Sequence, residues 1–202
     1  MNILLLGNAG AGKDTVAEAL GSDYHNIKFA TALRELAVKT STLNMEQLTE
    51  PDLKDAPTKY TVDYGFLASY VGGLEDIQAP NNLQTPRDYL NWLGTGVLRK
   101  KDPEWHIRQT SEQIHSDNNV FTDCRFVNEF ELVANLFGDN LTVLVIRDRN
   151  GTMPCEFEMM DIMVKLGWYA LAAEYDLNVK IIDNHYSTAK EFQQAALSIL
   201  ET

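Results

Sequence analysis

A glycine-rich segment near the start of the chain constrains its fold more than any other feature. The apolar run NILLL leads into GNAGAGKDT, and VAEAL then follows with helical spacing. Glycines allow positive φ and let a ligand approach the main chain closely. A strand, a glycine turn and a helix N-terminus together direct backbone N–H groups at one point, where an anion binds. The segment therefore predicts a phosphate-binding loop. The alternative is a glycine-rich turn that binds nothing.

The loop fits the pattern G-x-x-x-x-G-K in full, with Lys13 as the lysine for the outer phosphates. Asp14 follows that lysine, where the pattern usually has Ser or Thr, and the hydroxyl comes one position later as Thr15. The loop predicts phosphate binding more sharply than it predicts which phosphate or which reaction.

The rest of the chain alternates short apolar runs with helical patterns. Strands are expected at residues 2–6, 26–30, 119–122, 141–146 and 178–182, and helices at 31–40, 85–98, 102–115, 126–137, 156–175 and 188–200. This order predicts an α/β fold with a parallel five-stranded sheet and helices on both faces. We expect one domain over 1–202, with an excursion around 41–84 that contains a helix at 64–71, and a helical insertion around 152–176.

Ligands bind beyond the carboxyl ends of the strands in such sheets. The glycine loop, Asp123 and Arg147 all follow predicted strands, so one crevice can gather them. Asp123 is expected to hold Mg²⁺ through its water shell, with a helix cap as the alternative. Arg125 is expected to clamp a phosphate, or else to pair with a nearby glutamate. Arg147 or Arg149 would be a lid arginine, or part of a solvated turn.

The composition of the chain limits the classes of binding partner that we expect. The chain has 17 basic and 29 acidic residues, a net charge of −12, which argues against binding to nucleic-acid polymers or anionic membranes. Two cysteines predict no disulfide framework, so we expect a reduced, cytoplasmic location, in the host cytoplasm if the protein is viral. The four histidines show no metal-ligand spacing, and the three tryptophans are expected in the core.

Several segments resemble the phage-type deoxynucleoside monophosphate kinases, which are P-loop nucleotide kinases. The similar segments are Gly12-Lys13-Asp14-Thr15, Phe29-Ala30-x-x-Leu33-Arg34, Arg87-x-x-x-Asn91-x-x-Gly94-Thr95, Asp102-Pro103-x-Trp105, Asp123-x-Arg125-Phe126-x-Asn128-Glu129 and the strand that ends in Arg147. Their order and spacing, over most of residues 1–149, make the joint match more specific than any single segment.

The resemblance implies a three-layer α/β/α fold of the nucleoside-monophosphate-kinase type and ATP-dependent phosphorylation of deoxynucleoside monophosphates with Mg²⁺. The residues that it places around ATP are Gly10, Ala11, Gly12, Lys13, Asp14, Thr15 and Arg147. Those on the acceptor side are Arg34, Arg87, Asn91, Gly94, Thr95, Trp105, Arg125 and Asn128. The expected catalytic residues are Lys13, Asp14, Thr15, Asp123, Arg125 and Glu129, with Asp123 and Asp14 near the metal.

Two other functions remain open at this point. One is a P-loop kinase for another small molecule, such as a cofactor precursor. The other is a nucleotide-binding switch that hydrolyses its nucleotide slowly, although the N-K-x-D motif of GTPases is absent from the sequence. The accepted base, a preference for deoxyribose and the choice between monomer and homodimer are not encoded in any pattern that we recognise.

Overall fold

The computed structural model describes residues 1–77, 83–149 and 167–201. The chain divides into two compact units. The sheet unit comprises Met1–Lys28 and Thr110–Thr202, and the helical unit comprises Phe29–Gln109. The excursion expected at 41–84 lies inside the helical unit, which extends beyond it in both directions.

The sheet unit contains a five-stranded sheet in the order β2-β3-β1-β4-β5, and every neighbouring pair is parallel. The strands are β1 (Asn2–Gly7), β2 (His25–Ile27), β3 (Asn119–Phe121), β4 (Leu141–Arg147) and β5 (Asn178–Asp183). The predicted α/β fold with a parallel five-stranded sheet is thus confirmed. The prediction of a strand at 26–30 was too long, because Phe29 has helical backbone angles and caps a helix that begins at Ala30.

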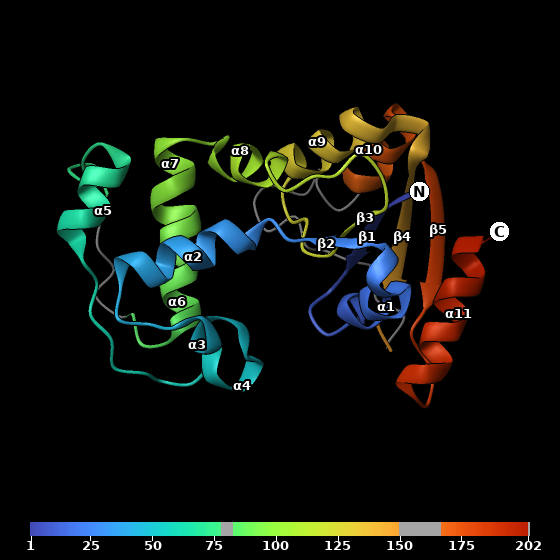
Figure 1. Cartoon of the computed structure of the whole chain (residues 1–202), viewed down its shortest axis with the longest axis horizontal. Helices are drawn as coiled ribbons and strands as arrows, with labels where there is room; N and C mark the ends of the chain where they lie inside the picture. Colours follow the sequence, from blue (N-terminus) through green and yellow to red (C-terminus); the bar gives the residue numbers. More distant parts are fainter. Residues whose placement is uncertain (78–82, 150–166, 202) are drawn as a thin grey trace. The chain divides into compact units, whose positions relative to one another are not determined.

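Helices cover both faces of this sheet (Figure 1). Consecutive residues of a strand point to opposite faces. Val120 of β3 joins the apolar cluster formed with α1 (Lys13–Leu20) and α11 (Ala189–Glu201). The next residue, Phe121, instead contacts Phe137, with ring centroids 6.1 Å apart. Buried apolar side chains on both faces explain why β1 and β4 are almost uniformly apolar.

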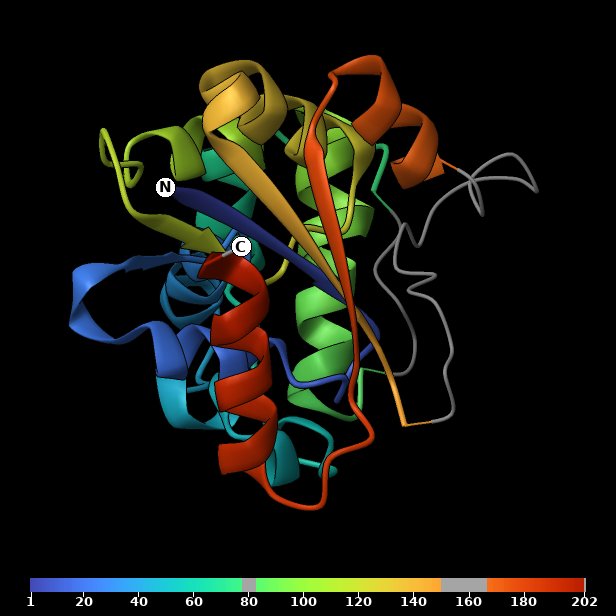
Figure 2. The same ribbon diagram turned by 90° about the vertical axis from the view of Figure 1, so that its right-hand side faces the viewer.

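The remaining elements of the sheet unit connect these layers. They are η1 (Gly21–Asp23), α9 (Val127–Phe137), η3 (Gly138–Asn140) and α10 (Gly167–Glu174). Figure 2 shows α11 in front of the sheet, beside β5. Of the helix expected at 156–175, the structure describes the part from Gly167 onward. The rest of it, with most of the insertion expected at 152–176, lies outside the described residues.

The helical unit consists of short helices around its own apolar cluster. They are α2 (Ala30–Thr40), α3 (Met45–Thr49), α4 (Pro51–Lys54), α5 (Tyr64–Val71), α6 (Pro86–Asn91), the π-helical segment η2 (Trp92–Leu98), α7 (Arg99–Lys101) and α8 (Trp105–Ser111), which ends just past the unit boundary. The helix predicted at 64–71 is confirmed, since Asp63 caps its first turn and Gly72 ends it with φ 74°. No described helix of either unit combines the length and the apolarity that a membrane span requires.

Two helix predictions in this unit need correction. The helix expected at 85–98 begins as predicted, with Thr85 and Asp88 in a capping box and Pro86 in the first turn. From Trp92 it continues as a π-helix rather than an α-helix. The helix expected at 102–115 is shorter, because Asp102 has an extended backbone that ends α7, and α8 begins only at Trp105.

Candidate functional site

The glycine loop joins β1 to α1 through a tight turn. Gly10 and Gly12 have φ values of +76° and +107°, which favour glycine. The Ala11 N–H donates to the Asn8 carbonyl at 3.0 Å and closes the turn. The helix begins at Lys13, and the first N–H groups of a helix have no partner within it. The loop therefore ends on N–H groups that are oriented to receive an anion.

Lys13 lies over its own loop. Its ammonium donates to the carbonyl oxygens of Gly7 and Asn8, the latter at 3.0 Å. A Cβ added to Gly10 would meet no atom within 4 Å, so the loop is open at this glycine. Open space beside backbone N–H groups and an ammonium fits an anion of phosphate size.

The opposite side of the loop is closely packed. A Cβ on Gly12 would lie 2.6 Å from Cε1 of Phe192 and 3.0 Å from Nδ2 of Asn184. A Cβ on Gly7 would lie 3.0 Å from the Ile146 carbonyl oxygen. The approach of neighbouring atoms thus favours glycine at Gly7 and Gly12, whereas at Gly10 positive φ alone favours it.

Asp14 and Thr15 lie in the first turn of α1 and have partners from other elements. The Asp14 carboxylate accepts from the ammonium of Lys28 at 2.7 Å. The Thr15 carbonyl accepts from Nε2 of Gln193 at 3.3 Å. Lys28 follows directly after β2 and was not identified from the sequence. It adds a second ammonium close to the start of α1.

The strand register brings two further predicted residues to the same edge of the sheet. Asp123 comes two residues after Phe121, which pairs with Leu4 of β1. Arg147 ends β4, one residue after Ile146, which pairs with Gly7. The carboxyl ends of β3, β1 and β4 are therefore neighbours, and they carry Asp123, the glycine loop and Arg147 side by side. These positions agree with the rule that ligands bind at this edge.

The segment from Asp123 to Glu129 is ordered by one buried carboxylate. Oε2 of Glu129, whose residue is 2% exposed, accepts from the backbone N–H of Arg125 at 2.7 Å and of Phe126 at 3.2 Å. Phe126 is the residue that caps α9, so Asp123 does not have the alternative role of helix cap. Glu129 thereby has a structural role that the sequence did not indicate, and its catalytic role stays a prediction. Asp123, Arg125 and Asn128 are half-buried.

Arg147 is engaged with the neighbouring strand. Its Nη2 donates to Oδ2 of Asp183 at 2.6 Å, and its Nε lies 2.5 Å from Oδ1. Asp183 is the residue paired with Arg147 in the β4–β5 register. The Nη2 contact is a hydrogen bond, whereas Nε has no partner in hydrogen-bond geometry among the described residues, so its approach to Oδ1 is a charge contact. Any contact of Arg147 with a nucleotide therefore competes with Asp183.

The predicted acceptor residues all lie in the helical unit or in the Asp123 segment. Arg34 of α2 is half-buried, and its Nε is buried without a hydrogen-bond partner among the described residues. Nε and Nη2 of Arg87 donate to the carboxylate of Asp55, the second at 2.9 Å. This guanidinium lowers the pKa of Asp55 through its hydrogen bonds and charge.

Three other predicted acceptor residues lie at the π-helical segment, Asn91 directly before it and Gly94 and Thr95 within it. Asn91 is exposed and Thr95 is half-buried, whereas Gly94 is buried. A Cβ added to Gly94 would be crowded, because it would lie 3.1 Å from Cδ2 of Leu33. π-helical turns often occur at functional sites. Gly94 lies close to Leu33 of α2, so this part of the segment is closely packed.

Trp105 is buried in the core of the helical unit at 7% exposure. Its Nε1 donates to the hydroxyl of Tyr70 at 3.2 Å, and its ring meets the edge of His106 with centroids 4.9 Å apart. His106 is 4% exposed. Burial, and next the charge of Arg99, lower the pKa of His106 to about 4, although hydrogen bonds to the backbone of Phe29 and Gly94 act in the opposite direction. A neutral imidazole thus joins the start of α2 to the π-helical turn.

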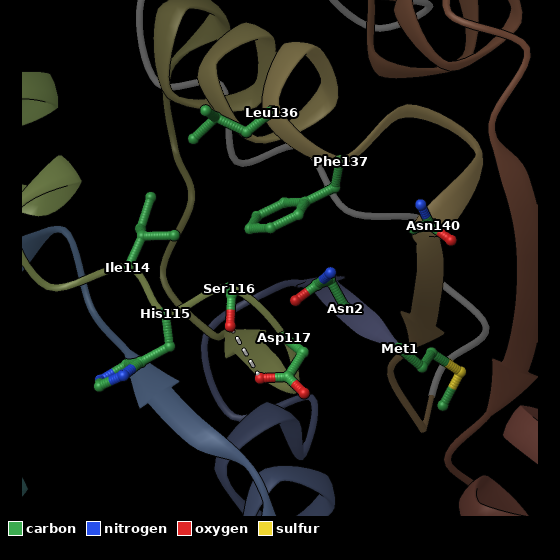
Figure 3. Close-up of a pocket in the computed structure, with 9 residues that line it drawn as sticks. All are labelled: Met1, Asn2, Ile114, His115, Ser116, Asp117, Leu136, Phe137 and Asn140. Atoms are coloured by element: carbon green, nitrogen blue, oxygen red, sulfur yellow. Dashed lines mark hydrogen bonds between the residues drawn. The ribbon is translucent and has the colours of Figure 1, made fainter.

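A separate pocket of about 480 Å³ lies at the other edge of the sheet (Figure 3). Its lining includes Met1 and Asn2 at the start of β1, Asp117 before β3 and Asn140 before β4. These are the amino ends of the strands, opposite to the edge that carries the glycine loop. The pocket is therefore distinct from the candidate phosphate site.

Among the described residues, no group of three or more His, Cys, Asp or Glu side chains is arranged to hold a metal ion. A Mg²⁺ bound mainly through water and phosphate oxygens needs only one or two carboxylates, so Asp123 and Asp14 still fit that role. No protein-family model matches the chain, and no curated protein matches it with significance.

Proposed function

We propose that this chain is an ATP-dependent kinase that phosphorylates deoxynucleoside monophosphates, and that its fold is the three-layer P-loop kinase type. The observation that carries the proposal is the glycine loop between β1 and α1, open at Gly10 and with the Lys13 ammonium held over it. That geometry supports binding of the donor phosphates. The acceptor part of the proposal is supported by the segments that resemble the deoxynucleoside monophosphate kinases.

Phosphoryl transfer needs little covalent help from a protein. It requires the donor and acceptor to be aligned and the charge on the transferred group to be neutralised. In this chain the loop N–H groups and Lys13 would bind the β- and γ-phosphates, and Arg125 would contact the transferred group. Mg²⁺, when bound, would neutralise part of the charge on the phosphates. Asp123 and Asp14 would orient its water ligands.

The acceptor monophosphate would be bound by arginines of the helical unit. Arg34 supports this role because its buried Nε has no hydrogen-bond partner among the described residues, so an anion would satisfy it. Arg87 would contribute after exchanging Asp55 for the substrate. The substrates in this proposal are small nucleotides rather than nucleic-acid polymers, which agrees with the net charge of −12.

An acceptor screen tests the proposal. Purified protein is incubated with ATP and Mg²⁺ and with each deoxynucleoside or ribonucleoside monophosphate in turn, and both ADP and the diphosphate product are measured. We expect at least one deoxynucleoside monophosphate to stimulate ADP release in equal amount with its diphosphate. The Lys13→Ala variant, prepared in parallel, reports any contaminating host kinase. ADP release that no acceptor stimulates would overturn the proposal.

A further inference from the structure

The connection between β5 and α11 contacts the glycine loop on its closely packed side. Asn184 follows β5 directly, and its backbone N–H donates to the Arg147 carbonyl at 3.0 Å, which fixes it at the carboxyl edge of the sheet. Its side-chain Nδ2 donates to the Ala11 carbonyl at 2.8 Å. The two residues are 173 positions apart in sequence. All of these atoms belong to the sheet unit.

This hydrogen bond determines the direction of one peptide group. The peptide bond is planar and trans, so the Ala11 carbonyl and the Gly12 N–H point in opposite directions. Because the carbonyl points at Asn184, the Gly12 N–H points away from it. Phe192 of α11 occupies the same side as Asn184, with Cε1 only 2.6 Å from the position of a Gly12 Cβ. The Gly12 N–H is therefore directed away from the packed side of the loop.

The opposite orientation would be unfavourable for binding an anion. If the peptide were reversed, the Ala11 carbonyl oxygen would face the phosphates and the Gly12 N–H would face Asn184. The Asn184 amide would then have to rotate so that its Oδ1 accepts from that N–H. The Ala11 carbonyl oxygen would still face the phosphates and repel them, and Asn184→Asp, which offers only acceptors, would favour this reversed orientation. Gly12 tolerates many backbone angles, so glycine alone does not select between the two orientations.

We propose that Asn184 is a positioning residue that holds the peptide between Ala11 and Gly12 so that the Gly12 N–H donates to a nucleotide phosphate. The inference rests on the proposed function, because it assumes that the loop binds a nucleoside di- or triphosphate. Asn184 does not touch the nucleotide in this role. It acts through the loop backbone, and its loss weakens phosphate binding without removing any phosphate ligand.

Two variants of Asn184 test this inference. Asn184→Asp has nearly the same shape but replaces the donor with a carboxylate, and Asn184→Ala removes the donor without adding charge. Binding of ADP with Mg²⁺ is measured by calorimetry. We expect Asn184→Ala to weaken ADP binding roughly tenfold and Asn184→Asp to weaken it more, since the Gly12 N–H is still present but no longer held in the orientation that donates to the anion. If Asn184→Asp does not fold, Asn184→Ala carries the test alone.

Asn135→Asp is the matched control. Asn135 lies exposed on α9 of the same unit, and its Nδ2 donates only a long bond of 3.4 Å to the Tyr175 hydroxyl. This variant makes the same chemical change and the same change in net charge. It should bind ADP like the unsubstituted protein.

NMR spectroscopy reports directly on the amide group of Gly12. Alanine precedes glycine only at residues 9–10 and 11–12 of the sequence, so labelling alanine carbonyls with ¹³C and glycine nitrogens with ¹⁵N selects the Gly10 and Gly12 amides. In the unsubstituted protein and in Asn135→Asp, we expect the Gly12 amide proton to move downfield when ADP and Mg²⁺ are added. In Asn184→Ala and Asn184→Asp, at saturating ADP, that shift should be lost.

The outcomes separate the two proposals. If the unsubstituted protein binds no ADP and neither amide responds, the proposed function fails, whatever Asn184 does. If the unsubstituted protein binds ADP and Asn184→Ala shows the same affinity or the same Gly12 shift, the role of Asn184 is overturned and the proposed function stands. A role in stability alone would lower the melting temperature and leave the Gly12 shift intact.

Discussion

The sheet unit and the helical unit hold their predicted site residues in different ways. In the sheet unit, the glycine loop, Asp123 and Arg147 follow neighbouring parallel strands, so the topology alone places them at one edge. In the helical unit, the predicted acceptor residues have dissimilar surroundings. Trp105 and Gly94 are buried in packing contacts, Asn91 is exposed, and Arg87 is paired with Asp55.

This difference teaches where a short motif is informative. A phosphate loop binds through backbone N–H groups, and the strand–turn–helix that orients them is visible as a local pattern. An acceptor pocket is made of side chains, and the same residue types serve equally well in a core or an ion pair. Four experiments test this contrast, from the largest expected effect to the smallest.

The largest effect is expected from Lys13→Ala. Its ammonium is held at the Gly7 and Asn8 carbonyls and would neutralise charge on the transferred phosphoryl group. We expect turnover to fall by about 10²- to 10³-fold, while the melting temperature changes by less than about 3 °C. A coupled assay of ADP release and a thermal melt measure the two quantities.

Lys190→Ala is the control for Lys13→Ala. Lys190 is exposed at the start of α11, and its loss should leave both turnover and melting temperature unchanged. Unfolding of Lys13→Ala would make this lysine structural and would contradict the assignment of the loop as a site.

The second experiment tests whether the burial of His106 controls the stability of the helical unit. His106 has a pKa of about 4 in the folded protein and near 6.5 when unfolded. The unfolded state therefore binds a proton first as the pH falls, so this histidine destabilises the fold progressively between pH 6.5 and 4 and contributes nothing above that window. The expected loss at pH 4 is about 3 kcal/mol. Replacing His106 with Gln should remove this part of the pH dependence.

Urea unfolding at a series of pH values measures the difference between the two proteins. In a Trp168→Phe background, Trp92 and Trp105 report on the helical unit, where both lie. The exposed His185, changed to Gln, is the control and should leave the slope unaltered. Equal slopes with and without His106 would show that its burial does not control the stability of this unit.

A third experiment asks whether Arg87 belongs to a pocket or only to its ion pair. If Arg87 binds the acceptor phosphate, Arg87→Ala should raise the KM for the acceptor roughly tenfold. Asp55→Asn releases Arg87 from its partner and should lower that KM or leave it unchanged. Initial rates at varied acceptor concentration distinguish these cases.

The Lys101–Asp76 ion pair is the control for this third experiment, because it is another exposed pair of the same unit. Lys101→Ala should not change the KM. If Asp55→Asn raises the KM as much as Arg87→Ala does, the pair serves the structure and Arg87 is not a substrate ligand.

The sequence predicts the secondary-structure elements better than it predicts the contacts between them. The apolar runs indicated all five strands, and Thr85 marked a helix start that the structure confirms. The π-helical segment was missed because its residues have an ordinary helical pattern. The apolar runs and the helix cap, which gave correct predictions, are local signals, since each acts within a few residues.

The missed site residues depend on long-range contacts. Asn184 reaches Ala11 across 173 positions, and Lys28 reaches Asp14 across 14. No local pattern encodes either contact, because each exists only after the sheet has aligned the ends of its strands. A search of the residues that directly follow the predicted strands would have missed both, because Lys28 lies within the strand predicted at 26–30 and Asn184 comes two residues after the one predicted at 178–182. Only the observed bounds of β2 and β5 place Lys28 and Asn184 directly after a strand.

The smallest effect concerns the ion pair between Asp14 and Lys28. The Asp14 side chain is 70% exposed and that of Lys28 is 30% exposed, so the pair is open to solvent and weak. If Asp14 orders the water around Mg²⁺, Lys28 competes with the metal for the same carboxylate. Asp14→Ala should then raise the Mg²⁺ concentration needed for half-maximal activity, and Lys28→Met should lower it, each by about two- to fivefold. Mg²⁺ titrations at saturating ATP measure both, with Lys190→Met as the control. Opposite shifts would show that the sheet edge binds metal through a side chain as well as phosphate through its backbone, whereas no shift in either variant would leave Asp14 as a residue that only holds Lys28 at the loop.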